Sequence, residues 1–335
     1  MTKHLCWALL LAMASGTAQA QTPEGMAPED FGFAPFEIET EVGPVECFVA
    51  TGRAPLDTTR SLPLVVYLQG SNYAPIFHGP EGAIRGTLFL GPWDFPDHHY
   101  AVIAKPEAPF WAERVGETPR AYHEALSLPW RVAAARAVVS DLARQPWVDR
   151  SRVAVVGHSE GADVAPWVAV DHPAVTHVAS LSGGALSQMY DFVLDIRRRQ
   201  RSGTVSFEEA EAEVAALHDR YRRIYAAPSA SDSLWQGDHS YLRWSSFFRA
   251  PLEAYLALDI PVFVAAGTAD EAVPVESADY LPLAFIQAGK ENLTYRVWPV
   301  DHFYREVTTE GETISRKPDV VSALRSWLEE RPATP

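Results

Sequence analysis

The sequence predicts an α/β protein with a mostly parallel central sheet flanked by helices. Short, continuous apolar runs recur along the chain, and segments with helical periodicity separate them. Strands that are apolar on both faces are typical of parallel sheets covered by helices on both sides. Apolar residues make up 47% of the chain and charged residues 21%, which allows a full core and does not fit a disordered or fibrous protein.

The predicted strands begin with a β-hairpin. Residues 36–40 and 45–50 flank Val42-Gly43-Pro44, a sequence typical of a turn between two strands. Six apolar runs follow, at residues 62–68, 100–104, 152–156, 177–181, 261–266 and 293–298. Their alternation with helical segments indicates an open α/β sheet.

Helical periodicity is clearest in two segments that could cross between strands. Residues 130–142 place five apolar side chains at helical spacing, and residues 318–330 form a second apolar stripe that begins at Pro318. Between about 186 and 255 no convincing strand is present, although residues 206–225 have a helical pattern. An insertion of this kind between two sheet strands predicts a helical lid.

The first 20 residues have the pattern of a secretory signal peptide. Lys3 and His4 precede an apolar run at residues 5–13, and Ala18-Gln19-Ala20 supplies small residues before a cut at Gln21. The alternative is an uncleaved anchor, but the run is too short for a bilayer core of ~30 Å. We therefore expect a secreted or periplasmic protein, with one α/β domain at residues 21–335 and no membrane attachment after cleavage.

The charge and the cysteines narrow the function classes. The formal net charge is −15, which disfavours binding to nucleic acid or to anionic membrane surfaces. Cys6 leaves with the signal peptide, so Cys47 has no partner for an intrachain disulfide.

We expect no metal and no cofactor. The densest group of potential metal ligands is Asp94, Asp97 and the adjacent His98 and His99, and adjacent histidines splay apart on most backbones. No glycine-rich loop for phosphate is present. The oligomeric state stays open.

The motif with the clearest chemistry is Gly157-His158-Ser159-Glu160-Gly161. It follows the run at 152–156 and precedes a helical segment, which is the strand–turn–helix setting of a G-x-S-x-G nucleophile. Gly157 and Gly161 remove side chains where strand and helix approach each other. The Ser159 hydroxyl would then stand clear of the sheet, and the Glu160 main-chain N–H would point to a developing oxyanion.

With this motif the sequence resembles the α/β-hydrolase superfamily, from the hairpin near Phe36 to the last helix. The resemblance implies the chain order serine, acid, histidine, with the acid after the strand that follows the lid and the histidine after the last strand. Asp270 and His302 occupy those positions. They imply a triad in which His302 takes the proton of Ser159 and Asp270 orients the imidazole.

Some alternatives stay open at these positions. Glu271 is a rival acid beside Asp270, and His302 could be a surface-loop histidine. Asp301 could orient another group or belong to a turn. We expect His158 to be a poor base, because adjacent residues on an extended backbone point to opposite faces.

The second oxyanion donor is expected in the loop after residues 62–68, which has the sequence Gln69-Gly70-Ser71-Asn72-Tyr73. The resemblance implies a His-Gly loop here, and Gln69 replaces the histidine. The second oxyanion donor could therefore be the main-chain N–H of Gly70, Ser71 or Asn72, and we favour Ser71.

The function predicted from these residues is hydrolysis of a small or medium carboxylic ester through a Ser-acyl intermediate. A serine peptidase similar to the prolyl-oligopeptidase group is one alternative, and a binding protein that has lost catalysis is another. The ligand would be a small-molecule ester or a peptide. A set of lid aromatics could line the acyl pocket or pack the lid: Trp235, Tyr241, Trp244, Phe247, Phe248 and Tyr255.

Overall fold

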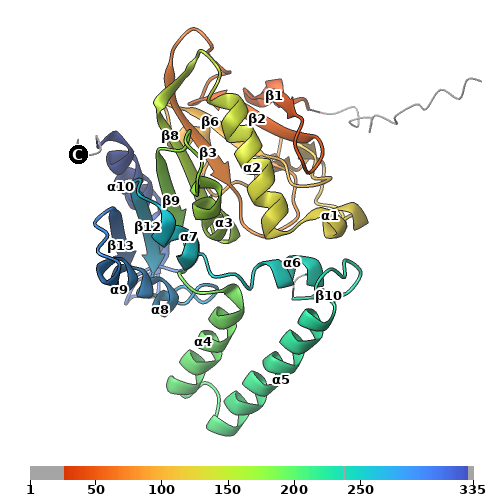
Figure 1. Ribbon diagram of the computed structural model, residues 1–335, viewed down its shortest axis with the longest axis vertical. Helices are drawn as coiled ribbons and strands as arrows, with labels where there is room; N and C mark the ends of the chain where they lie inside the picture. Colours follow the sequence, from red (N-terminus) through yellow and green to blue (C-terminus); the bar gives the residue numbers. More distant parts are fainter. Residues whose placement is uncertain (1–25, 81, 237, 331–335) are drawn as a thin grey trace, which may run out of the picture.

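The computed structural model describes residues 26–80, 82–236 and 238–330 (Figure 1). The predicted signal peptide, Cys6 and Gln21 lie outside the described residues. Within the described ranges, no helix combines the length and apolar character that crossing a membrane requires.

An eight-stranded sheet forms the centre of the molecule (Figure 1). Its spatial order is β1 (Ala34–Ile38), β2 (Val45–Thr51), β6 (His99–Ile103), β3 (Leu62–Leu68), β8 (Val148–His158), β9 (His177–Leu181), β12 (Val262–Gly267) and β13 (Leu293–Trp298). All neighbours from β6 to β13 pair in parallel. The hairpin β1–β2 adds two antiparallel strands at one edge. The predicted α/β-hydrolase architecture, with a mostly parallel sheet and flanking helices, is confirmed.

Two apolar cores cover the two faces of this sheet. Successive β8 residues alternate between them, because adjacent side chains of a strand point to opposite faces. Val155 packs with α2 (Leu128–Leu142), α3 (Glu160–Ala169) and α9 (Tyr280–Gln287). Val156 packs in the other core, with α10 (Lys317–Glu329) and the aromatic loops near the N-terminus.

The edge strand β13 differs from the expectation of a strand buried on both faces. Arg296 and Val297 are exposed, and the other residues of β13 are half-buried. β13 pairs with β12 alone among the strands described, so one of its sides has no covering strand.

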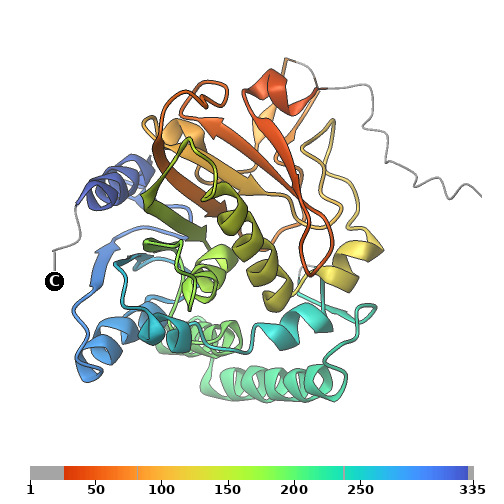
Figure 2. The ribbon, with the colours of Figure 1, turned by 45° about the horizontal axis from the view of Figure 1, so that its top comes forward.

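The described residues of the segment between β9 and β12 contribute no strand to the central sheet. α4 (Gln188–Arg201) and α5 (Phe207–Ala226) lie next to each other at one end of the molecule (Figures 1 and 2). Arg197–Glu211 and Arg199–Glu213 ion pairs connect these two helices. The segment continues through β10 (Leu234–Trp235), β11 (His239–Ser240), α6 (Tyr241–Ser246) and α7 (Leu252–Ala257). The two-residue ladder β10–β11 is a short strand pair that the sequence pattern did not indicate.

The remaining elements are short and lie in the loops. They are η1 (Pro28–Phe31), β4 (Phe77–His78), β5 (Arg85–Gly86), η2 (Pro92–Asp94), β7 (Trp111–Ala112), α1 (Arg120–Ala125), α8 (Val275–Ala278), β14 (Arg305–Val307) and β15 (Thr313–Ser315).

Two glycines allow β3, β8 and α3 to approach closely at the carboxyl edge of the sheet. A Cβ at Gly157 would lie 2.0 Å from the Gly161 carbonyl oxygen. A Cβ at Gly161 would lie 2.0 Å from the Leu68 carbonyl oxygen. Both obstacles are main-chain atoms, which cannot rotate away as a flexible side chain could.

Gly161→Ala should therefore lower the free energy of unfolding by more than about 3 kcal/mol, because the new methyl group collides with β3. Gly116→Ala is the control, since a Cβ at Gly116 meets no atom within 4 Å. Urea unfolding of both variants measures the effect. Equal midpoints for the two variants would contradict the close approach.

Candidate active site

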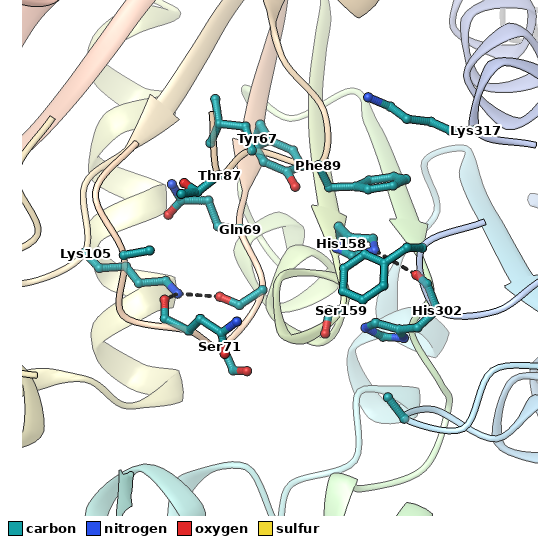
Figure 3. A pocket seen from close by; sticks show the side chains of 16 residues that line it. Tyr67, Gln69, Ser71, Thr87, Phe89, Lys105, His158, Ser159, His302 and Lys317 are labelled. Carbon is teal, nitrogen blue, oxygen red and sulfur yellow. Dashed lines mark hydrogen bonds between the residues drawn. The ribbon is translucent and has the colours of Figure 1, made fainter. Parts of the chain in front are cut away.

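Ser159 lies on a strained turn between β8 and α3. Its φ is 57° and its ψ is −125°, a combination outside the regions that non-glycine residues favour. The turn is fixed on both sides, because the Ser159 N–H donates to Leu181 O at 2.9 Å and Ala162 N–H donates to Ser159 O at 2.8 Å. Ser159 borders a cavity of about 690 Å³ at the carboxyl edge of the sheet (Figure 3).

A buried carboxylate orients the second candidate residue. Asp270, in the loop after β12, is 1% exposed. Its Oδ1 accepts the N–H groups of Ala272 and Val273, both at 2.8 Å, and its Oδ2 lies 2.8 Å from His302 Nδ1. These contacts hold the carboxylate in one orientation. Because His302 Nδ1 carries the proton that it donates to Asp270, His302 Nε2 is the ring nitrogen that can accept another proton. Glu271 forms no hydrogen bond with His302 among the described contacts.

Main-chain contacts position His302. Its carbonyl oxygen accepts from Ser182 Oγ at 2.9 Å and lies 3.1 Å from His158 Nε2. Ser159 and His302 border the same cavity (Figure 3). The hydrogen bonds of the described residues do not include one between Ser159 Oγ and His302 Nε2. Such bonds are often long in unliganded enzymes and tighten when substrate binds.

The neighbouring turn residue Asp301 has a different environment. Asp301 Oδ1 accepts the N–H groups of Phe303 and Arg305, and its other oxygen pairs with the Arg305 guanidinium. It therefore stabilises the turn that carries His302.

His158 occupies a position that the sequence argument did not anticipate. It borders the same cavity as Ser159, whereas we expected it on the opposite face. The expectation was wrong because the positive φ of Ser159 ends the strand alternation at that residue. The His158 ring stacks on Phe89 with centroids 4.1 Å apart. Burial, together with the nearby His302, lowers the pKa of His158 to about 3, so it stays neutral and serves as a donor to the His302 carbonyl.

The Glu160 side chain is the centre of a buried ion cluster. Glu160 Oε1 accepts from Arg131 of α2 at 2.6 Å, and Oε2 accepts from Arg243 Nε of α6 at 2.8 Å and from Arg243 Nη2. Burial alone would raise the pKa of Glu160, but Arg243 and Arg131 lower it below its ordinary value. Arg243 also donates to Gln188 Oε1 of α4 at 2.6 Å. The carboxylate therefore connects the start of α3 to α2 and to two helices of the predicted lid.

The main-chain N–H of Glu160 has the position expected of an oxyanion donor. Glu160 is the first residue of α3, so no preceding turn of helix supplies an acceptor for its N–H. The helix dipole adds positive potential at the same point.

Four carbonyl groups of the loop after β3 are held by donors on other elements. Gln69 O accepts from Arg131 Nη2 at 2.6 Å, and Ser71 O accepts from Tyr122 Oη at 2.9 Å. Gly70 O and Asn72 O both accept from Lys105 Nζ, at 2.5 Å each. Arg131 belongs to α2, Tyr122 to α1, and Lys105 to the loop after β6.

The direction of these carbonyls determines the direction of the loop N–H groups. In a trans peptide the N–H points opposite to the C=O, and the described residues contain no cis peptide bonds. The Gly70 carbonyl points to Lys105, so the Ser71 N–H points away from Lys105, and the loop passes between Lys105 and Ser159 (Figure 3). A Cβ at Gly70 would lie 3.3 Å from Ser159 Cβ, which shows how close the loop comes. This orientation favours Ser71 as the second donor.

Lys105 is a site residue that the sequence analysis missed. It lies two residues after the end of β6, is 6% exposed and pairs with main-chain carbonyls rather than with a carboxylate. Burial, with Arg131 nearby, lowers its pKa to about 7. The signal available in the sequence was a lysine immediately after a predicted buried strand, at the edge where Ser159 was also expected.

The structure also describes the densest group of potential metal ligands in the sequence, for which no metal was expected, and the predicted lid aromatics. His99 lies 2.9 Å from both Thr51 Oγ1 and Trp147 O, which uses both ring nitrogens. No cluster suited to holding a metal ion occurs among the described His, Cys, Asp and Glu residues. Of the six lid aromatics, Trp244 borders a second cavity beside Ser159, while Phe247 and Tyr255 are buried in the core on one face of the sheet.

Solved structures with the same architecture cover most of the chain. A Mycobacterium tuberculosis puromycin-hydrolyzing peptidase superposes with a TM-score of 0.54 at 17% identity, over 92% of this chain and 40% of that one. The chain has the α/β-hydrolase fold. An acylaminoacyl peptidase bound to Z-Gly-Gly-Phe-chloromethyl ketone gives a TM-score of 0.57 at 12% identity, over 90% of this chain and 42% of that one.

A third structure matches along its whole length. DcsB, in complex with its substrate analogue, gives a TM-score of 0.53 at 13% identity, over 90% of this chain and 100% of that one. The chain therefore spans less than half of the two peptidases and all of DcsB. No family model matches the sequence, and no curated protein matches it.

Lys105→Met should slow the reaction of Ser159 with a fluorophosphonate by about a hundredfold or more, because the loop loses the donor that orients the Ser71 N–H. Lys290→Met is the matched control, since Lys290 also donates to a main-chain carbonyl, Leu258 O, but far from the site. Labelling time courses before completion, from which the rate constants are obtained, and melting curves should be recorded together. A labelling rate equal to that of the control would rule out this role for Lys105.

Proposed function

We propose that this protein is a serine hydrolase that cleaves carboxylic esters through a Ser-acyl intermediate. The observation that carries the proposal is the hydrogen bond from His302 to the buried Asp270, at the cavity that Ser159 borders from a strained turn. This supports the proposal, because an imidazole oriented by a buried carboxylate can take the proton of a nearby serine hydroxyl and make it nucleophilic.

In the proposed reaction His302 Nε2 takes the proton of Ser159 Oγ while the oxygen attacks the ester carbonyl. The resulting oxyanion lies against the N–H groups of Glu160 and Ser71, each worth about 2.7–4 kcal/mol of barrier in comparable sites. His302 then protonates the departing alcohol, and Asp270 stabilises the imidazolium in between. A water molecule, deprotonated by His302, releases the acid and restores Ser159.

A serine peptidase is the second candidate. Two of the fold neighbours are named as peptidases, and a Ser-acyl intermediate serves amide substrates equally well. The same residues would act, with an amine in place of the alcohol as leaving group. The secreted or periplasmic location also stays a proposal, and it rests on the pattern of residues 1–20.

Ser159→Ala should abolish both fluorophosphonate labelling and turnover of a 4-nitrophenyl ester, because the nucleophile is gone. Asp270→Asn should reduce turnover by a factor on the order of 10⁴, because the imidazole loses its orienting carboxylate. Ser151→Ala is the control and should leave labelling and turnover unchanged, since Ser151 is an exposed serine whose hydroxyl donates a hydrogen bond to Asp149.

Steady-state kinetics on an aryl ester and on a short peptide amide would separate the two candidate activities. Undiminished labelling of Ser159→Ala would refute the assignment of the nucleophile. A well-folded wild-type protein that reacts with no probe would indicate a binding protein on the same fold.

A further inference from the structure

A smaller cavity of about 280 Å³ lies next to the main one and also reaches Ser159. α3, α4, α6 and the loop after β12 supply its walls. Ser71 and Ser159 border both cavities, whereas His302 borders the larger cavity and not the smaller one. The leaving group must lie near the histidine that protonates it. The larger cavity therefore suits the leaving group, and the smaller one suits the acyl part of the substrate.

The walls of the smaller cavity are strongly acidic. One guanidinium, that of Arg243, and several carboxyl groups border it: Glu160, Asp163, Asp191, Asp195 and Glu271. Glu160 is paired with Arg131 and Arg243, and Asp195 with Arg199. The other three carboxyl groups form no ion pair among the described residues. His239, which also borders the cavity, is neutral because burial and Arg243 lower its pKa to about 4.

Asp191 is the least satisfied of these groups. It lies on α4, is 5% exposed and its Oδ1 has no hydrogen-bond partner among the described residues. Burial and the neighbouring Asp163 raise its pKa well above the ordinary value. Burial likewise raises the pKa of Asp163 to about 7, although Gln188 Nε2 donates to Asp163 Oδ2 at 2.8 Å. The raised pKa values favour the protonated, neutral forms of both groups while no cation is present. A cationic ligand group bound beside them would favour their ionised forms, so these two neighbouring buried carboxyl groups indicate a position for a positively charged ligand group.

The charge on such a ligand fits an ammonium group better than a metal ion or an anion. The carboxyl groups do not form a cluster suited to a metal among the described residues. An anion would have to bind Arg243, and only Nη1 of that guanidinium lacks a hydrogen-bond partner among the described residues, since Nε and Nη2 already donate to Glu160 and Gln188. An anion would therefore gain one donor and would lie among several carboxyl groups.

We propose that the smaller cavity binds a protonated amine on the acyl part of the substrate, with Asp191 and Asp163 as its partners. The substrates are then esters or amides of amino acids, with the amine toward α4 and the leaving group toward His302. This inference rests on the proposed serine hydrolase function and specifies its substrate class.

The test compares 4-nitrophenyl esters of matched length. The pairs are glycyl with propanoyl and β-alanyl with butanoyl, in which an ammonium replaces a methyl group, and a succinyl ester supplies a negative charge. Spontaneous hydrolysis is measured with Ser159→Ala and subtracted. In at least one pair, kcat/KM should be at least about tenfold higher for the aminoacyl ester, since a buried ammonium–carboxylate contact is charge-assisted.

Asp191→Asn should reduce this preference at least about fivefold, because the carboxylate is lost while the shape stays the same. Asp219→Asn is the matched control, since Asp219 lies on α5 and pairs with Arg222 outside the cavity. Butylammonium should inhibit hydrolysis of the butanoyl ester competitively, and butanol should not.

The outcomes separate this inference from the function on which it rests. Turnover of the uncharged esters without any preference for the ammonium overturns the amine site and leaves the serine hydrolase intact. A preference for the succinyl ester, or an aminoacyl preference that survives in Asp191→Asn, also overturns the amine site. If the protein turns over none of the esters, the proposed function is refuted together with this inference.

Discussion

The arrangement of the site depends on the buried carboxylate of Glu160. One side chain at the start of α3 compensates two buried guanidinium groups, those of Arg131 and Arg243. Removing one partner from a buried ion pair costs about 3–5 kcal/mol, because the remaining charge stays buried without compensation. Glu160 therefore fixes its own main-chain N–H next to Ser159. Through Arg131 it also fixes the Gln69 carbonyl of the facing loop.

The same cluster connects the rigid sheet to the segment inserted between β9 and β12. Arg243 and Gln188 belong to that segment, and both contact the cluster. Arg198 of α4 also donates to the Asp270 carbonyl at 2.6 Å, which links the helix pair to the loop that carries the candidate acid. A site built in this way is held from both sides before any substrate arrives, and such preorganisation is the main source of oxyanion stabilisation in enzymes.

The apolar runs and helical periodicities predicted the fold well, because such patterns depend only on residues that are close together in the sequence. The predicted strands at 62–68, 177–181 and 293–298 coincide with β3, β9 and β13. The resemblance placed the histidine after the last strand, at His302, and favoured Asp270 over the adjacent Glu271 as the acid. The structure brings His302 and Asp270 into hydrogen-bond contact. The sequence could not indicate that the Glu160 and Lys105 side chains are buried, because their partners are distant along the chain. His158 was placed on the wrong face because the alternation rule fails at a residue with positive φ.

A crystal structure of the protein with a fluorophosphonate bound to Ser159 would test the central claim most directly. The phosphonyl oxygen should lie about 2.7–3.1 Å from the main-chain nitrogens of both Glu160 and Ser71, with the carbonyls of Gly70 and Asn72 still on Lys105. An oxygen that faces solvent, or a loop that has turned its carbonyls toward Ser159, would contradict it.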